Sequence, residues 1–149
     1  MPAPIKTFFD GKYIYSVDMM LAYINIIGHP VEKKPTADLV PQLELEVWGD
    51  WSPMTVIKNM DKKKYATNAE RIEKANMTYP IIIAGGRIVD GYHRTAKAYL
   101  KGTKQMKAYI FNAALMRKFI LNKDMNFVKV HEHTSIRDIL ELWTKRFCN

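Results

Sequence analysis

The sequence predicts an α+β fold, with helices and strands mixed along one compact domain of 149 residues. Apolar segments with strand character, above all residues 80–84, are interspersed with segments of helical periodicity. Hydrophobic residues make up 48% of the chain, which is enough to build a core. No internal repeat or low-complexity tract interrupts this pattern. We therefore expect a single globular domain.

Helix signals dominate the half of the chain before residue 80. Ser16 is placed to cap a helix that reaches about Ile27. Thr67, with Glu70 three residues later, has the pattern of a capping box at the start of another helix. The remaining expectations are a short strand or extended arm at 6–15, a loop at 31–35, a short helix and then a strand at 36–47, and a helix start at Ser52-Pro53.

The centre of the chain carries the clearest pattern. Three consecutive isoleucines in residues 80–84 predict a buried strand, and Gly85-Gly86 predicts a tight hairpin turn before a return strand at 87–89. Asp90-Gly91 then leads into a helix that ends at Gly102. Later expectations are a strand at 106–111, a helical segment at 115–121, an extended segment at 127–131 and a final helix from Thr134 or Ser135.

Charge and composition favour an anionic partner inside the cell. Lys and Arg outnumber Asp and Glu by 23 to 15, and the net charge of +8 favours nucleic acids, nucleotides or anionic membranes, unless the lysines only aid solubility. No apolar run approaches the roughly 20 residues of a membrane-spanning helix. The first ten residues lack the features of a secretory signal. With Cys148 as the single cysteine, no internal disulfide is possible, so we expect a cytoplasmic or nuclear protein.

The residues with the clearest chemical meaning follow the return strand, in the order Asp90, Gly91, Tyr92, His93 and Arg94. The first amides of the helix that begins here have no partner within it, and the helix dipole adds partial positive charge. Gly91 leaves these amides open, while His93 and Arg94 add donors in the first turn. We predict a phosphate or nucleotide site at Gly91, Tyr92, His93 and Arg94.

Asp90 has two interpretations. It can cap the helix, or it can hold Mg²⁺ or activate a hydroxyl beside a bound phosphate. If the protein is an enzyme, Asp90 and His93 are the predicted catalytic residues. No metal site made of protein ligands alone is predicted, because His131 and His133 supply two ligands where three or four are needed.

Residues 79–110 resemble the core of the ParB/sulfiredoxin superfamily. The likeness lies in the order of a buried strand, a hairpin, a turn of the type D/S-G-x-H/R-R, an alanine-containing helix and another strand. It implies a compact domain in which helices flank a small mixed sheet. The core unit then spans about residues 48–111 and has helical extensions at both ends. The resemblance also implies phosphate binding at Gly91, His93 and Arg94.

The branches of this superfamily imply different activities. Tyr92 stands where sulfiredoxins have their reactive cysteine, and no helix-turn-helix follows the turn, as one does in ParB proteins. The turn is most similar to that of the ADP-dependent serine kinases, whose catalytic glutamate lies upstream. We predict a ParB-like protein that binds nucleic acid or a nucleotide. The alternatives are a phosphotransferase that uses a nucleotide with Mg²⁺, and a protein-interaction scaffold.

A basic stripe extends the predicted site. Arg94, Lys97, Lys101 and Lys104 recur at helical spacing, so they share one side of the helix. Such a stripe is usually a solvated face, but lysines at 58 and 62–64 extend the positive charge. We predict Lys97, Lys101 and Lys104 as DNA-binding residues. The residues expected to face inward are Ala96, Tyr99 and Leu100.

Overall fold

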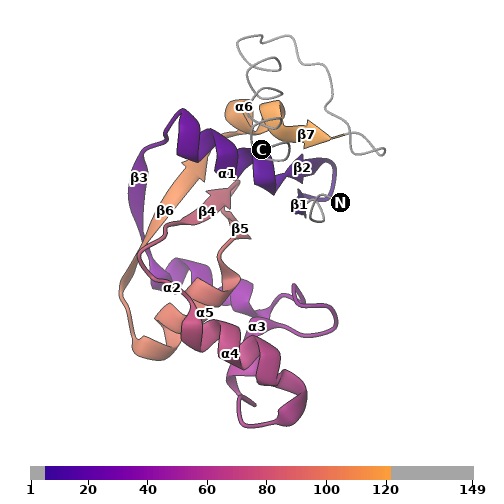
Figure 1. The fold of residues 1–149 in the computed structure, drawn as a ribbon, viewed down its shortest axis with the longest axis vertical. Coiled ribbons are helices and arrows are strands. Elements are labelled where there is room, and N and C mark those ends of the chain that lie inside the picture. Colours follow the sequence, from indigo (N-terminus) through magenta and orange to yellow (C-terminus); the bar gives the residue numbers. More distant parts are fainter. Residues whose placement is uncertain (1–5, 122–149) are drawn as a thin grey trace. The chain divides into compact units, whose positions relative to one another are not determined.

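The computed structural model describes residues 6–121 (Figure 1). It divides into two compact units: one contains residues 6–30 and 111–121, and the other is Val31–Ile110. Helices and two small sheets confirm the α+β class. The single domain with its core at 48–111 stays a prediction. The expected elements after residue 121, His131, His133 and Cys148 lie outside the described residues.

The first unit contains a three-stranded sheet in the order β1-β2-β7. Ser16 caps α1 as predicted, because its Oγ accepts the N–H of Met19 at 3.2 Å. The rings of Phe111 and Phe119, both fully buried, pack against each other and against Tyr23. The elements are β1 (Thr7–Phe9), β2 (Ile14–Ser16), α1 (Val17–Ile26), α6 (Ala113–Met116), the 3₁₀ helix η3 (Arg117–Phe119) and β7 (Ile120–Leu121).

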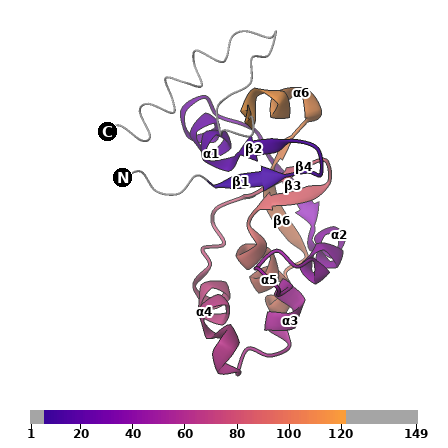
Figure 2. The same ribbon diagram turned by 90° about the vertical axis from the view of Figure 1, so that its right-hand side faces the viewer.

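The second unit contains a four-stranded sheet in the order β3-β6-β4-β5. Figures 1 and 2 show its four α-helices grouped together at one end of this sheet. The strands are β3 (Val31–Pro35), β4 (Ile81–Ala84), β5 (Arg87–Asp90) and β6 (Gln105–Phe111). The helices are α2 (Thr36–Leu39), η1 (Val40–Glu44), α3 (Pro53–Ile57), η2 (Lys63–Tyr65), α4 (Ala66–Lys74) and α5 (Tyr92–Lys101), of which η1 and η2 are 3₁₀ helices.

Two apolar clusters form the core of the second unit. One lies between the sheet and helices α2 and α5, and includes Ile81, Ile83, Ile88, Ala98 and Met106. The other joins the helices to one another, and includes Leu43, Met54, Val56, Ile72 and Ala96. Both clusters therefore contain residues of α5, which fixes the start of that helix relative to β4 and β5.

The predicted centre of the chain is confirmed. Every residue of β4 is buried, as its run of isoleucines predicted. Gly85 and Gly86 have φ angles of 58° and 77°, the left-handed conformation that a two-residue hairpin turn of this type requires. At the other end of α5, Gly102 ends the helix, also with a left-handed backbone.

Two predictions upstream of this centre are wrong. Residues 31–35 form β3 and not a loop, because they pair along their whole length with β6. Residues 43–47 do not form a strand. Leu43 is buried within η1, while Leu45 is 40% exposed, so their alternation does not mark two faces of a sheet.

Two details of the helices also differ from the predictions. No capping box forms at Thr67, because α4 already begins at Ala66 and Glu70 pairs with Lys74 on the next turn. On α5, Tyr99 and Leu100 were expected to face inward, but they are 40% and 46% exposed. The small residues Thr95, Ala96 and Ala98 occupy the buried side instead, so α5 packs closely against its neighbours.

The open edge of β5 is paired with a side chain. β5 is the last strand of its sheet, and Gln42 of η1 lies beside it. The side-chain amide of Gln42 donates to the carbonyl of Gly86, and its oxygen accepts the N–H of Ile88, both at 2.7 Å. Gln42 thus satisfies backbone groups that an edge strand leaves unpaired, and it anchors the hairpin that leads to Asp90.

Candidate phosphate-binding turn

Gly91 shapes the turn between β5 and α5. Its φ of 116° lies in the region that side chains rarely adopt, and it forms the N-cap of α5. A Cβ atom at this position would lie 2.4 Å from Cγ2 of Ile81 and 2.8 Å from its Cβ. Glycine is therefore required here by the close approach of β4, a contact that the sequence pattern did not reveal.

The N-terminal end of α5 is positive. Because its N-cap is a glycine, no N-cap side chain accepts from the first amides, and the first turn contains no acidic residue. Asp90 was a candidate cap, but its Oδ2 instead accepts a hydrogen bond from Nη2 of Arg94 at 2.9 Å. Thr95 closes the turn, since its N–H and its hydroxyl both donate to the carbonyl of Gly91 at 2.9 Å.

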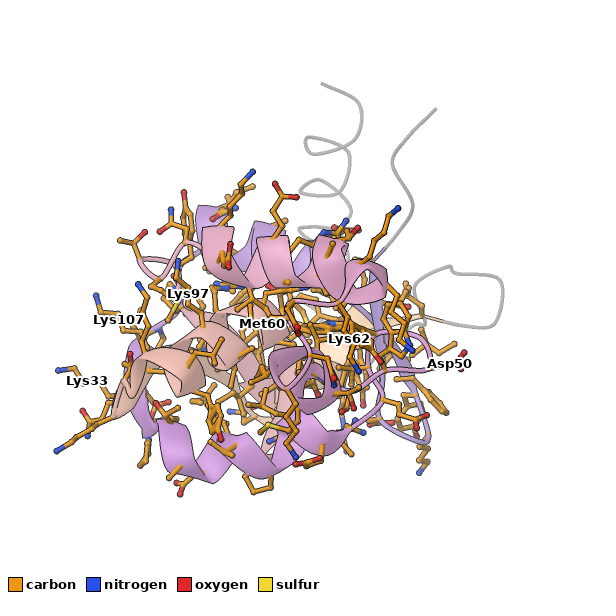
Figure 3. All side chains as sticks on the ribbon, turned by 90° about the horizontal axis from the view of Figure 1, so that it is seen from below. Lys33, Asp50, Met60, Lys62, Lys97 and Lys107 are labelled. Carbon is orange, nitrogen blue, oxygen red and sulfur yellow. The ribbon has the colours of Figure 1, made fainter. Side chains whose placement is uncertain are left out.

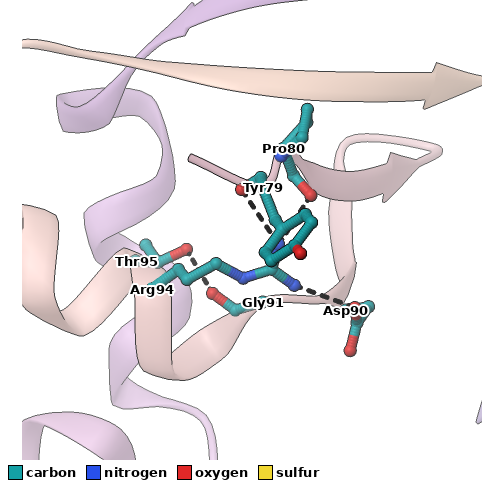
Figure 4. Close-up of polar contacts among 6 residues, drawn as sticks. All are labelled: Tyr79, Pro80, Asp90, Gly91, Arg94 and Thr95. Atoms are coloured by element: carbon teal, nitrogen blue, oxygen red, sulfur yellow. Dashed lines mark hydrogen bonds and ion pairs between the residues drawn. The ribbon is translucent and has the colours of Figure 1, made fainter. Parts of the chain in front are cut away.

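Arg94 ties the turn to the start of β4. Its Nη1 donates to the carbonyls of Tyr79 and Pro80, at 3.0 and 2.7 Å, in addition to the bond from Nη2 to Asp90 (Figure 4). Only 17% of the Arg94 side chain and 13% of the Asp90 side chain are exposed. The guanidinium therefore already has three internal bonds, and its predicted contact with a phosphate stays a prediction.

His93 is oriented by two neighbours. Its imidazole stacks on the indole of Trp48, with ring centroids 4.3 Å apart and an interplanar angle of 15°. Its Nε2 lies 3.0 Å from Oδ1 of Asn68 on α4. Trp48 belongs to a tight turn whose ends, Trp48 and Trp51, are joined by two backbone hydrogen bonds. The sequence indicated His93 but not Asn68, because nothing in the pattern of α4 marks that residue.

Tyr92 is mainly a packing residue. Its half-buried ring packs against both apolar clusters of the second unit. Burial raises the pKa of the Tyr92 hydroxyl, and the nearby guanidinium of Arg87 opposes this shift. The hydroxyl therefore stays protonated at neutral pH. The sequence placed Tyr92 in the phosphate site, which stays a prediction, and the backbone amide of Tyr92 lies in the first turn of α5.

The predicted basic stripe has two different parts. The ammonium group of Lys97 donates to the carbonyls of Glu73 and Ala75, at 2.7 and 2.9 Å, at the C-terminal end of α4. Helix carbonyls at that end lack partners and carry partial negative charge. Lys101 and Lys104 are exposed. Lys97 is thus a capping residue for α4, and Lys101 and Lys104 form the surface part of the stripe.

The contribution of Lys97 to the stability of α4 can be measured with two substitutions. Lys97→Met should lower the free energy of unfolding by about 1 kcal/mol, the usual net value of a hydrogen bond in a protein, because two carbonyls lose their donor. Lys101→Met, which removes the same charge from the same helix, should change it by less than about 0.5 kcal/mol. Urea denaturation measures both. Equal effects of the two substitutions would show that the Lys97 contacts do not stabilise α4.

The groups expected of a phosphotransferase are only partly assembled. Asp90, the predicted ligand for Mg²⁺ or base for a hydroxyl, is bonded to Arg94. Among residues 6–121, no three His, Cys, Asp or Glu side chains gather in a way that could hold a metal ion. Nucleotide-borne Mg²⁺ needs only one or two carboxylates besides the phosphates, and Asp90 is the carboxylate at this turn.

Within the described part of the chain, no helix has the length and apolar character that crossing a membrane requires. No protein-family model, curated protein or solved structure matches the chain. The resemblance to the ParB/sulfiredoxin superfamily therefore stays a prediction that rests on residues 79–110.

Proposed function

We propose that this is an intracellular protein that binds the phosphate of a nucleotide or a nucleic acid at the N-terminal turn of α5. The observation that carries the proposal is the fixed position of His93. Stacking on Trp48 and the contact with Asn68 hold its imidazole in the first turn of a ten-residue helix whose N-cap is a glycine. Donors that are oriented in advance lose little entropy when an anion binds.

The proposed donors are the backbone amides of Tyr92, His93 and Arg94 together with Nδ1 of His93, which donates when the imidazole carries both protons, because Nε2 faces the amide oxygen of Asn68. Helix N-termini are common phosphate sites, since unpaired amides and the dipole act on the same anion. Trp48 offers an aromatic ring next to the imidazole, and base stacking on such a ring contributes about 1–3 kcal/mol. The net charge of +8 also favours the approach of polyanions.

Binding is favoured over phosphate transfer because of Asp90. A kinase-like reaction needs a carboxylate that reaches a metal ion or the attacking hydroxyl. At this turn the Asp90 carboxylate is largely buried and paired with Arg94. The phosphotransferase therefore remains the alternative, and conversion of ATP or ADP in the presence of serine-like hydroxyl acceptors is the assay that distinguishes it.

The test of the proposal is a thermal-shift panel of ADP, ATP, CTP, GTP and a short oligonucleotide, each with and without Mg²⁺. A ligand at about 100 times its dissociation constant adds roughly 2.7 kcal/mol of stability, which is readily seen as a higher melting temperature. In ¹⁵N spectra, the amides of Tyr92, His93 and Arg94 should shift most.

His93→Ala should weaken binding about five- to tenfold, the equivalent of one hydrogen bond of roughly 1–1.4 kcal/mol. Lys101→Gln, at the far end of α5, should leave the affinity for a mononucleotide unchanged. A folded His93→Ala variant that binds as tightly as the parent would contradict the proposed site. So would the absence of any shift across the whole ligand panel.

A further inference from the structure

Two lysines lie directly opposite each other on neighbouring strands. Lys33 of β3 is the register partner of Lys107 of β6, and both are exposed. Figure 3 shows the two side chains projecting close together. Within residues 6–121, neither forms an ion pair with an acidic side chain. Cross-strand partners have Cβ atoms about 4.5–5.5 Å apart, and like charges at this distance destabilise a sheet.

The fold itself does not require this pair. On the other side of β6, Met106 and Ala108 pack into the apolar cluster beneath α2 and α5. The single acid of β3, Glu32, is the partner of Ala108, so it lies on the opposite face from the lysines. A lysine opposite a glutamate would keep the surface equally polar, and the opposite charges would attract each other across the two strands. The lysine pair therefore contributes no attraction to the sheet, and both side chains are exposed to solvent.

Positive charge continues from this pair towards the end of α5. The carbonyl of Lys104 accepts the N–H of Thr36 at 2.9 Å, which places Lys104 beside the end of β3. Lys101 is the last residue of α5. Both lysines are exposed, and neither has an ion pair in the described part of the chain.

We infer that Lys33 and Lys107, continued by Lys104 and Lys101, form a surface that contacts successive phosphates of a nucleic-acid backbone. The inference deepens the proposed function and rests on it, since it selects a polynucleotide over a mononucleotide as the ligand. A strand of phosphates neutralises the repulsion between the paired lysines and releases condensed counterions. Lys97, which the sequence placed in such a surface, is not part of it because α4 occupies its ammonium group.

The experiment measures the salt dependence of binding. Fluorescence anisotropy with labelled 20-residue single-stranded and duplex DNA compares the parent with Lys33→Gln/Lys107→Gln at several salt concentrations. Each phosphate contact contributes about −0.9 for a duplex, or −0.7 for a single strand, to the slope of log affinity against log salt. The double variant should therefore flatten the slope by about 1.8 or 1.4. The control Lys12→Gln/Arg117→Gln removes equal charge from exposed residues of the first unit and should leave the slope unchanged.

The outcomes separate this inference from the proposed function. An unchanged slope in the Lys33/Lys107 variant overturns the inference. ADP binding without oligonucleotide binding, even at low salt, also overturns it, but leaves the α5 site in place. Oligonucleotide binding that depends on the lysine pair but not on His93 supports the inference and contradicts the α5 site. If the variant loses binding to phosphatidylserine vesicles but not to DNA, the partner is a membrane surface and the inference fails.

A second variant tests directly how much the repulsion between Lys33 and Lys107 destabilises the sheet. Lys33→Glu replaces repulsion across the strands with attraction, so the melting temperature should rise by a few degrees. The same change should weaken oligonucleotide binding more than Lys33→Gln does. Higher stability with weaker binding is the behaviour of residues kept for a ligand at the expense of the fold. A lower melting temperature would show that the pair stabilises the sheet and would contradict the inference.

Discussion

Gly91→Val is expected to destabilise the protein by about 2–5 kcal/mol, the largest effect of any single change considered for this turn. The backbone φ of 116° costs a residue with a side chain about 1–2 kcal/mol. The added Cβ, 2.4 Å from Ile81, adds an overpacking penalty of about 1–3 kcal/mol. Since a small domain is stable by only about 5–15 kcal/mol, a large part of its stability is lost.

Gly102 offers a matched control at the other end of α5. It also has a positive φ, of 68°, but no atom lies within 4 Å of the position of its missing Cβ. Gly102→Ala therefore carries only the cost of an ordinary left-handed backbone, whereas Gly91→Ala carries the higher cost of a φ of 116° together with the clash against β4. Urea denaturation of both alanine variants should show a difference of about 1–3 kcal/mol. Equal losses would mean that β4 does not restrict Gly91.

The second large effect is expected from Arg94→Ala, at about 3 kcal/mol of unfolding free energy. The change leaves the largely buried Asp90 carboxylate without its partner and removes the donor of the Tyr79 and Pro80 carbonyls. Arg94→Lys should not restore this stability, since an ammonium group cannot reproduce the planar fork of the guanidinium. Denaturation curves for both variants provide the measurement.

A double-mutant cycle shows whether Arg94 acts within the protein or on a ligand. If Asp90 is its main partner, the Asp90→Ala/Arg94→Ala variant should lose less stability than the sum of the single changes, by about 0.5–3 kcal/mol. A ligand role alone predicts the opposite pattern: unchanged stability of Arg94→Ala together with lost phosphate affinity. That result would contradict the internal role described for this side chain.

Local signals in the sequence predicted local structure well. Ser16, the isoleucines of β4, the Gly85-Gly86 turn and Gly102 each act through their own backbone or through residues a few positions away. For such features, the side chain and the conformation that it favours lie in the same short stretch. The α+β class and the strand–turn–helix around Gly91 could therefore be predicted without a structure.

The features that could not be predicted depend on distant partners. The sequence of β3 is rich in charges and ends in proline, so it predicts a loop. Only the pairing with β6, which the sequence does not reveal, makes it a strand. Lys97 was placed correctly on one side of α5, but helical spacing does not show that the carbonyls of Glu73 and Ala75 lie there. For Arg94, the deciding partners are carbonyls at the entry to β4, which carry no sequence signature.

The division of the chain into units has a consequence for biosynthesis. The second unit is one continuous segment, whereas the first is completed by Phe111, Phe119 and β7, whose Ile120 pairs with Tyr15 of β2. Ribosomes add about 5–20 residues per second, so β7, the second partner of β2, is synthesised roughly 5–20 seconds after β2. The second unit has all its strands earlier. During translation we therefore expect the middle of the chain to fold before its beginning.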